Sequence, residues 1–391
     1  FSDLKPGFNF YYDKGSIKNA GYLLLSNPDP NKNGIPNIEL WDLNDQRLIH
    51  RYDFRPLEIL KKTGNIRDKK TIRFIHPLLL EDGSLIVHSS HTYDDPGILF
   101  KFDKCGKYIS HNQKYGYHHS LEVDKKGDLY IPIANIPNEI NKNEYPYRFR
   151  NEGFAVLSKD LEVKKTYSLL SIFSESGLSN EIYSESQLSD DPLHLNHVNP
   201  LILKNKTKMV YLSLRHQAAL IGYNLTNKKL SWIIKGATGL QHYVTPLDND
   251  GNSISVFDNN SRNTRSKHLG NKLLEIGNLE TKDSLSKFYL GEFLKDQGLT
   301  KKEYDFSLMN ENLRPITQTE GLGSLISENN SIYVEETNYG RLFEIDKTNG
   351  RLLWQYLNKG YNGTIYMMSW SRRLESLPRN LNVKSFSECT K

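Results

Sequence analysis

Three segments of the chain place a histidine just ahead of an expected strand. They are residues 117–123 with the pair His118-His119, residues 193–198 with His194, and residues 239–259, which begin near Gln241-His242. In each, the histidine precedes alternating apolar residues, which are typical of a β-strand. Histidines at similar places in successive repeats predict that several imidazoles converge on one site.

Arg215 adds a fixed positive charge to this set, because it ends a second expected strand within the His194 repeat. A neutral imidazole can act as a nucleophile or as a general acid–base. A guanidinium binds oxyanions through two parallel hydrogen bonds. The combination, which needs no carboxylate, favours the transfer of an anionic group.

The elements that carry these residues belong to a repeat in which a polar turn leads into a short apolar strand. The clearest first strands lie at 21–25, 82–87, 126–131, 207–212, 250–256 and 330–334, and the clearest following strands at 38–43, 98–103, 154–157, 219–224 and 340–346. Period-two alternation, aromatic and β-branched residues, and Gly, Asn and Asp turns predict antiparallel sheets.

About six units of roughly four strands each predict an all-β fold, a six-bladed β-propeller with inserted loops and short helices. We expect a single domain over 1–391 whose first and last segments close the ring, with blades at roughly 1–55, 72–113, 117–167, 194–236, 241–290 and 311–370. The innermost strand of each blade would carry the histidines to the mouth of a central channel. Long insertions are expected at about 134–150, 168–193 and 285–318, and the last two contain helix-like stretches such as 285–290.

The ordered motifs resemble those of the bacterial arylsulfate sulfotransferases, whose fold is a six-bladed propeller. The motifs are His118-His119, His194-Leu195-Asn196, Ser213-Leu214-Arg215, Gln241-His242 and Phe257-Asp258-Asn259, with a final-blade pattern over 335–354. The resemblance runs from about residue 70 onward. Each motif alone is weak, but four of them in the right order are fairly specific.

The resemblance implies a role for each candidate. His242 matches the histidine that becomes sulfated, and His194, Arg215 and one of His118 and His119, preferably His119, match the residues that hold the sulfuryl oxygens. It implies transfer of a sulfuryl group from an aryl sulfate to a phenol, with no nucleotide donor, no cofactor and no metal.

The chain departs from the family pattern at several points. Ser120, His197 and Tyr243 replace residues that the family often carries after its histidine motifs, the segment 365–370 lacks an expected arginine, and a closely spaced cysteine pair is missing.

Other features have plainer interpretations. A lone histidine at a strand start is usually structural, and His76, which no family motif supports, is interpreted so. We interpret Phe257-Asp258-Asn259 as a structural turn, Glu335-Glu336 as a solvated edge, and Trp41, Trp232 and Trp354 as packing between blades.

The motifs that other functions would need are missing from the sequence. The histidines form no short metal-binding spacing, and Arg215 would repel a cation. The sulfatase motif Cys-x-Pro-x-Arg, the tryptophan docking motifs of quinone-dependent propellers and a phosphate-binding glycine loop are all absent from the sequence. The remaining alternatives are a non-catalytic binding propeller, or a hydrolase or other transferase that acts on anionic esters.

Composition limits the partners. A net charge of +5, from 51 basic and 46 acidic residues, is not a nucleic-acid footprint, and no apolar run is long enough to span a membrane.

The start at Phe1 suggests a removed N-terminal segment and, with it, a periplasmic or otherwise exported protein. Cys105 and Cys389 could pair or stay free, and we favour free thiols. The expected partners are the aryl sulfate and the phenol, and a homodimer is compatible with the sequence.

Overall fold

The structure, a computed structural model, describes residues 4–17, 19–32, 34–55, 59, 63, 73–89, 97–134, 136, 149–182, 190–261, 270–279 and 287–390. Strands dominate these residues, and the helices among them are short. In the described part of the chain, no helix is both long and apolar enough to cross a membrane.

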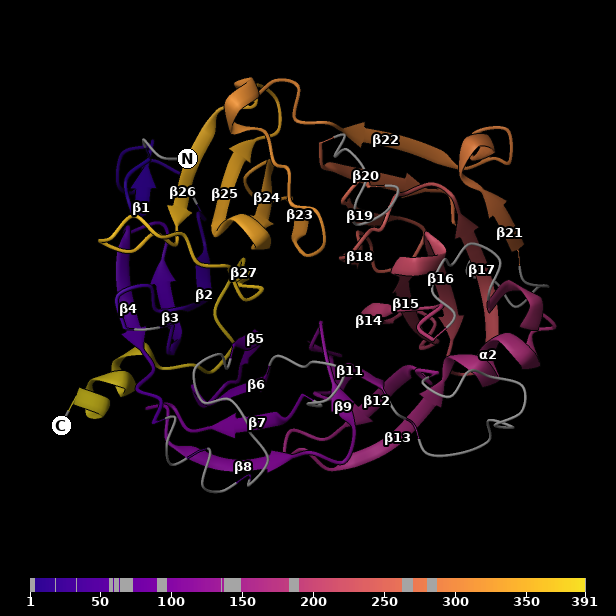
Figure 1. The fold of residues 1–391 in the computed structure, drawn as a ribbon, viewed down its shortest axis with the longest axis horizontal. Coiled ribbons are helices and arrows are strands. Elements are labelled where there is room, and N and C mark those ends of the chain that lie inside the picture. The colour runs from indigo at the N-terminus through magenta and orange to yellow at the C-terminus, as the bar shows by residue number, and fades with distance from the viewer. Residues whose placement is uncertain are drawn as a thin grey trace. The chain divides into compact units, whose positions relative to one another are not determined.

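The fold class is the predicted one, an all-β, six-bladed β-propeller (Figure 1), with six small sheets of mostly antiparallel strands. The chain divides into two compact units, each with three of the sheets. Unit 1 comprises Phe1–Tyr117 and Ser307–Lys391, and unit 2 comprises His118–Phe306. The single domain and its blade boundaries stay a prediction, and the two units are described separately below.

Unit 1 holds the first, second and last sheets. The first sheet contains β27 (Arg372–Leu374), β2 (Tyr22–Pro28), β3 (Pro36–Asp42) and β4 (Arg47–Arg51). The second contains β5 (Phe74–Leu79), β6 (Leu85–Ser89), β7 (Leu99–Phe102) and β8 (Tyr108–Asn112), and β9 (Gly116–Tyr117) follows it. The last contains β1 (Gly7–Phe10), β26 (Leu352–Leu357), β25 (Arg341–Asp346), β24 (Ser331–Glu336) and β23 (Leu322–Ile326). Short 3-10 turns lie at η4 (Glu311–Leu313), η5 (Thr337–Tyr339) and η6 (Val383–Thr390).

The two ends of the chain exchange strands within unit 1. N-terminal β1 pairs with β26 of the last sheet, and C-terminal β27 pairs with β2 of the first. The first and last sheets therefore each contain a strand from the opposite end of the sequence. This exchange adds backbone hydrogen bonds between segments more than 300 residues apart in sequence.

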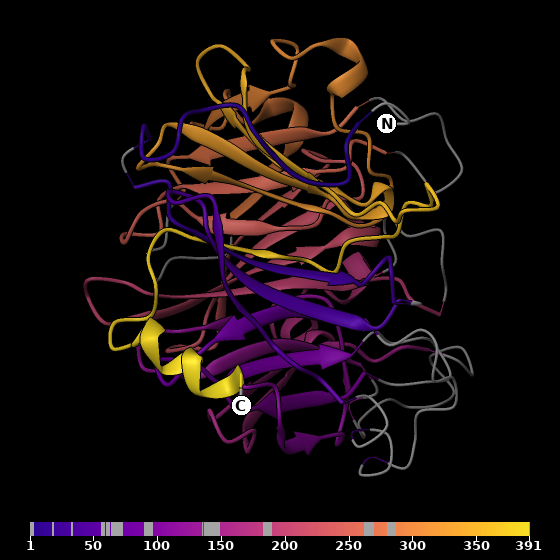
Figure 2. The ribbon, with the colours of Figure 1, turned by 90° about the vertical axis from the view of Figure 1, so that its left-hand side faces the viewer.

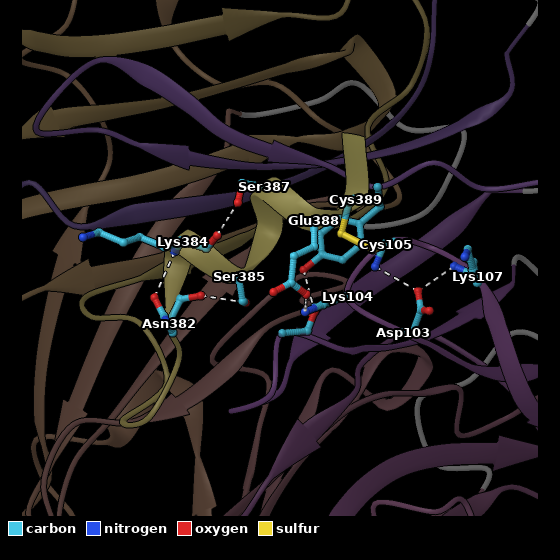
Figure 3. Close-up of a disulfide and its surroundings, with 12 residues drawn as sticks. Asp103, Lys104, Cys105, Lys107, Asn382, Lys384, Ser385, Ser387, Glu388 and Cys389 are labelled. Atoms are coloured by element: carbon cyan, nitrogen blue, oxygen red, sulfur yellow. Dashed lines mark hydrogen bonds and ion pairs between the residues drawn. A yellow bond between two sulfur atoms is a disulfide. The ribbon is translucent and has the colours of Figure 1, made fainter. Parts of the chain in front are cut away.

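A disulfide joins Cys105 to Cys389, so the prediction of free thiols was wrong (Figure 3). The sequence separation of 284 residues concealed this proximity. The terminal turn η6, yellow in Figure 2, brings Cys389 to the β7–β8 turn, where the Phe386 ring stacks on His50 with centroids 4.3 Å apart. Lys104 and Glu388 form an ion pair at 2.5 Å beside the disulfide.

Glu335 and Glu336 are buried in unit 1, which corrects their interpretation as a solvated edge. Glu335 accepts hydrogen bonds from the backbone N–H groups of Trp370 and Ser371 at 2.8 and 2.7 Å, and Glu336 pairs with Arg341 at 3.0 Å. The carboxylate of Glu335 thereby anchors the segment that leads into β27.

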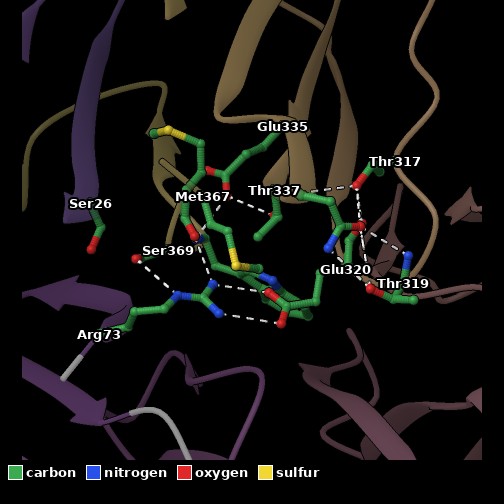
Figure 4. A network of polar contacts seen from close by, with 12 residues as sticks. Ser26, Arg73, Thr317, Thr319, Glu320, Glu335, Thr337, Met367 and Ser369 are labelled. Atoms are coloured by element: carbon green, nitrogen blue, oxygen red, sulfur yellow. Dashed lines mark hydrogen bonds and ion pairs between the residues drawn. The ribbon is translucent and has the colours of Figure 1, made fainter. Parts of the chain in front are cut away.

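The segment 365–370 does receive a guanidinium, but from Arg73, just ahead of β5 (Figure 4). Its Nη2 donates to the carbonyl of Met368 at 2.6 Å. The same guanidinium binds both carboxylate oxygens of Glu320, at 3.3 and 2.9 Å.

Unit 2 holds the third, fourth and fifth sheets. The third contains β10 (Glu122–Val123), β11 (Leu129–Ala134), β12 (Gly153–Leu157) and β13 (Val163–Ser168). The fourth contains β14 (Leu195–Ile202), β15 (Lys208–Leu214), β16 (Ala219–Asn224), β17 (Lys229–Lys235) and β21 (Lys287–Leu290). The fifth contains β18 (Val244–Pro246), β19 (Ile254–Asp258), β20 (Lys272–Gly277) and β22 (Thr300–Tyr304). Helical turns lie at α2 (Leu169–Glu175), η1 (Ser179–Ile182), η2 (Arg215–Gln217) and η3 (Gly291–Phe293).

The insertions are described in part. The 168–193 insertion contains α2 and η1, as expected, with Ser168 capping α2. The helix expected at 285–290 is wrong, because 287–290 form strand β21, parallel to β17 (Figure 1). Four residues are too short for a stable helix, and the edge of β17 offers backbone partners instead. Most of the 134–150 insertion lies outside the described residues.

Trp232 packs between the fourth and fifth sheets, as predicted. Its buried ring shares a cluster with Leu220 of β16 and with Val256 and Leu274 of β19 and β20. Gly222 makes room for it, because a Cβ there would lie 2.4 Å from the Trp232 ring. This packing fixes the spacing between the two sheets that carry Arg215 and His242.

Candidate functional site

His119 and His194 occupy equivalent backbone positions in unit 2. Each has a left-handed φ, 57° for His119 and 51° for His194, shortly before the first strand of its sheet, β10 or β14. In the fifth sheet the left-handed residue is Leu240, with φ 54°. His242 therefore lies two residues further along its repeat than the other two histidines, which corrects the expectation of equivalent places.

The left-handed conformation is uncommon for residues other than glycine, although histidine adopts it more readily than most. It turns the chain sharply before the strand begins. In the fourth sheet the pairing register also shifts between Leu195 and His197, which leaves Asn196 in an irregular position. These local distortions set the directions of the side chains at the sheet entry.

All five predicted residues lie in unit 2, and their contacts bring them into one cluster. The ring of His119 lies 5.2 Å from that of His194 and 6.1 Å from that of His242, centroid to centroid. The Nδ1 atoms of His118 and His119 are 2.8 Å apart. Arg215 joins the cluster through its backbone N–H, which donates to the carbonyl of His194 at 3.0 Å.

His242 is fully buried and is held by Asn259. Its Nδ1 lies 2.6 Å from the carboxamide oxygen of Asn259. A carboxamide oxygen only accepts, so Nδ1 carries the proton and Nε2 keeps its lone pair. Burial and the neighbouring charge of Arg215 lower the pKa of His242 well below its ordinary value. The ring is therefore neutral near neutral pH. Asn259, interpreted from sequence as part of a structural turn, orients this ring.

His194 is oriented by a carboxylate. Its Nδ1 donates to Asp191 at 2.6 Å, which leaves Nε2 as the atom that can act on a substrate. Burial lowers the pKa of His194, and the charge of Arg215 lowers it further, against the opposing effect of Asp191. Burial alone would raise the pKa of Asp191, but His194 and Arg150 hold it below its usual range.

His216 packs between His194 and Arg215. Its ring stacks on His194 with centroids 4.3 Å apart. Its Nδ1 donates to the carbonyl of Asp191 at 2.6 Å, and its Nε2 accepts from Nη1 of Arg215 at 2.8 Å. Burial, then the neighbouring His194, lowers the pKa of His216 to about 3. His216 therefore contacts Arg215 as a neutral ring near neutral pH.

Asp191, His194 and His216 have potential ligand atoms within 4.8 Å of one another and form the one candidate metal cluster among the described residues. The donor set fits a cation poorly. Both ring nitrogens of His216 already make hydrogen bonds, and Nδ1 of His194 donates a proton to Asp191. The adjacent guanidinium of Arg215 adds repulsion.

The buried carboxyl group of Glu152 lies beside His118. Oε1 of Glu152 is 3.6 Å from Nε2 of His118 and 3.0 Å from Nε of Arg150. Its Oε2 accepts a short hydrogen bond from the backbone N–H of Leu195. Burial, reinforced by the charge of Asp191, raises the pKa of Glu152 to about 8, which outweighs the opposing effect of Arg150.

Gln241 and Asn196 connect the fourth and fifth sheets beside the site. The side-chain nitrogen of Gln241 donates to the carbonyls of Leu214 and Ala219 at 3.1 and 3.0 Å. Asn196 donates to the carbonyl of Gln241 at 2.7 Å. These bonds fix His242 against the end of β15, where Arg215 begins.

The three departures near the histidines all make contacts between the sheets of unit 2. Ser120 accepts from the backbone N–H of Val198 at 3.1 Å. His197 accepts from the N–H of Val244 at 3.2 Å through Nδ1, so its Nε2 carries the proton that faces Glu122 at 3.3 Å. The hydroxyl of Tyr243 donates to the same carboxylate oxygen at 3.2 Å. The departures thus form a connected set that ties the third, fourth and fifth sheets together.

Sequence reasoning missed several residues of the cluster. They are Arg150, Glu152, Asp191, His216 and Asn259. His216 adjoins Arg215 in sequence, and that adjacency was a usable signal. Arg150, Glu152 and Asp191 come from the edges of long insertions. No repeating pattern in these segments shows which side chains turn inward.

A family model described as "Arylsulfotransferase (ASST)" matches residues 76–359, which include all five predicted site residues. No curated protein matches the chain.

Solved structures give more distant likenesses. A putative 6-phosphogluconolactonase from Bacteroides fragilis is 10% identical with a TM-score of 0.45, covering 85% of this chain and 79% of that one. The Cps50 (Swd1) β-propeller domain of Myceliophteria thermophila is 9% identical with a TM-score of 0.45, covering 89% and 88%. The dihydro-heme d1 dehydrogenase NirN is 10% identical with a TM-score of 0.38, and the match covers 91% of this chain but 58% of NirN. Likenesses at this level carry no argument about function.

Proposed function

The chain belongs to the arylsulfotransferase family, and we propose that it moves a sulfuryl group from an aryl sulfate ester to a phenolic acceptor through a covalent intermediate on His242. The donor needs no nucleotide, and the reaction needs no metal. The family membership supports an arylsulfotransferase activity in general. The cluster in unit 2 supports the more specific steps.

One observation carries the proposal: a buried, neutral histidine lies within the electrostatic influence of an arginine. Nδ1 of His242 is held by Asn259, and the charge of Arg215 contributes to the low pKa of the ring. A lone pair on Nε2 suits attack on sulfur, and a guanidinium suits the sulfuryl oxygens.

In the first half-reaction, Nε2 of His242 attacks the sulfur and a nitrogen–sulfur bond forms. The bond between sulfur and the aryl oxygen breaks, and the phenolate leaves with its electron pair. Arg215 and His194 stabilise the charge on the sulfuryl oxygens. In the second half-reaction, an acceptor phenol, deprotonated as it arrives, attacks the same sulfur through its oxygen. The nitrogen–sulfur bond breaks, and its electron pair returns to Nε2 of His242 as the imidazole is regenerated. Two steps through one covalent intermediate give ping-pong kinetics.

We also propose that the protein works in an exported compartment. The disulfide between Cys105 and Cys389 supports this, because such bonds persist mainly in oxidising environments.

The test uses 4-nitrophenyl sulfate as donor and phenol as acceptor. The wild-type protein should release 4-nitrophenol and form phenyl sulfate, and donor alone should leave one sulfuryl group on His242, detectable by mass spectrometry. His242→Ala should lower turnover by at least about 10³-fold, because no intermediate can form.

The matched control is His76→Asn in unit 1. His76 shares the left-handed position, with φ 49°, which asparagine tolerates. The His76→Asn variant should transfer sulfuryl groups at the rate of the wild type. Near-normal transfer by His242→Ala would rule out the covalent mechanism, and donor binding without turnover by the wild type would favour a non-catalytic binding propeller.

A further inference from the structure

We propose that Glu152, His118 and His119 form a proton relay that protonates the departing phenolate and later takes the proton of the acceptor phenol. The proposal rests on the sulfuryl transfer proposed above and extends it to Glu152. It assigns a role to a carboxyl group that the transfer itself does not use.

The relay follows a short path through three side chains of unit 2. Oε1 of Glu152 lies 3.6 Å from Nε2 of His118, and Nδ1 of His118 lies 2.8 Å from Nδ1 of His119. The first gap is longer than a hydrogen bond, but contacts of this kind are often long before substrate binds and tighten with it. At the far end, the ring of His119 lies beside those of His194 and His242.

The protons balance along this path. At the start, Glu152 carries a proton, His118 carries its proton on Nδ1, and His119 carries its proton on Nε2. As the phenolate leaves, Nε2 of His119 gives up its proton, Nδ1 of His119 receives one from His118, and Nε2 of His118 receives one from Glu152. Each histidine ends as the opposite neutral tautomer, and Glu152 ends as a carboxylate. The acceptor phenol reverses every transfer, so the full cycle consumes no proton.

The surroundings of Glu152 suit a group that stores a proton and releases it. Burial and the nearby charge of Asp191 disfavour a second carboxylate, so the raised pKa of Glu152, about 8, keeps it protonated at neutral pH. Arg150 contacts Oε1 of Glu152 at 3.0 Å and Oδ2 of Asp191 at 3.9 Å, and can stabilise the carboxylate once it forms. Glu152 thus holds the proton in one half of the cycle and tolerates its absence in the other.

A sharp test compares two donors that differ in their need for a proton. Phenyl sulfate releases a strongly basic phenolate, whereas 4-nitrophenyl sulfate releases a weakly basic one. Glu152→Gln keeps the shape of the side chain and an acceptor for the N–H of Leu195, but cannot transfer a proton. It should lower single-turnover sulfation of His242 by about 10²-fold with phenyl sulfate, a usual size for general acid catalysis. The loss with 4-nitrophenyl sulfate should be at least tenfold smaller.

The matched control is Glu122→Gln. Glu122 is a second buried carboxylate of unit 2, but it contacts His197 and Tyr243 instead of the relay. Its substitution should change the rates with both donors by the same factor. Equal losses with both donors for Glu152→Gln would overturn the relay while leaving sulfuryl transfer intact. A wild-type protein that sulfates nothing would instead overturn the proposed function.

The wild-type protein provides an independent measurement if Glu152→Gln does not fold. Several protons move together in the relay, so the rate in D₂O should fall more with phenyl sulfate than with 4-nitrophenyl sulfate. An identical solvent isotope effect for the two donors would contradict the relay. His118→Gln, which breaks the middle of the path, should reproduce the donor dependence of Glu152→Gln.

Discussion

Both units contain histidines with a left-handed backbone near the start of a sheet, but different groups surround them. In unit 1, His76 is fully buried, its backbone N–H donates to the carbonyl of Ser369, and its ring packs on Trp370. In unit 2, His119 and His194 are partly exposed and lie against each other. A shared left-handed backbone conformation therefore does not give these histidines the same surroundings.

The guanidinium groups differ in the same way. In unit 1, Arg73 binds Glu320, Arg341 binds Glu336 and Arg373 binds Glu344 at 2.9 to 3.0 Å. In unit 2, Nη1 of Arg215 donates to the neutral ring of His216. Burial is the main cause of the lowered pKa values of His242 and His194, and the charge of Arg215 adds to both shifts. These three arginines of unit 1 are thus paired with carboxylates, whereas Arg215 of unit 2 contacts a neutral imidazole.

Within this comparison, the largest expected effect separates these two kinds of arginine. Arg215→Ala should lower sulfuryl transfer by about 10²–10³-fold, as loss of one preorganised donor to an oxyanion usually does. Arg73→Ala should leave turnover per folded molecule unchanged and lower stability, because it leaves Glu320 without its partner. Steady-state transfer and urea denaturation of both variants measure the two effects. A large loss of turnover in Arg73→Ala, with none in Arg215→Ala, would reverse the assignment of the units.

The disulfide lies within unit 1. Its removal should therefore lower the stability of the fold and leave sulfuryl transfer unchanged. Replacing both Cys105 and Cys389 with serine should lower the free energy of unfolding by about 2–5 kcal/mol, since the bond restricts the unfolded chain. Turnover at a temperature where the variant is folded should match the wild type. Chemical denaturation with and without reductant checks the first part, and the nitrophenyl sulfate assay checks the second. Lost activity in a folded variant would mean that the site depends on unit 1.

The fold could be predicted from sequence because its signals are local. Turn residues followed by alternating apolar residues marked strands such as β6, β11 and β19, which all formed where expected. The exceptions are set by distant partners. Strand β21 exists because the edge of β17 accepts it, and β1 and β27 join sheets at the opposite end of the sequence.

The candidate site was predictable only where it coincided with strand ends. His194 and Arg215 lie at strand ends of the repeat, and His242 was marked by the Gln241-His242 motif, whereas Glu152 and Asp191 approach from insertions whose course no pattern sets. The partners of the charged side chains could not be predicted from the sequence either. Glu335 reads as a surface residue, but its carboxylate is buried against two backbone N–H groups.

The smallest expected effect concerns the neutral ring that separates Arg215 from Asp191. The pKa of His216 is about 3 in the folded protein and near its ordinary value of 6.5 when unfolded. Between these values the unfolded chain binds the extra proton, so the stabilisation from His216 is complete above pH 6.5 and is lost as the pH falls. By pH 5 this loss amounts to up to about 2 kcal/mol. His216→Gln removes the titration, so its free energy of unfolding should fall less than that of the wild type between pH 7.5 and pH 5. Urea denaturation of both proteins at the two pH values measures the difference, and equal falls would show that His216 is not held neutral.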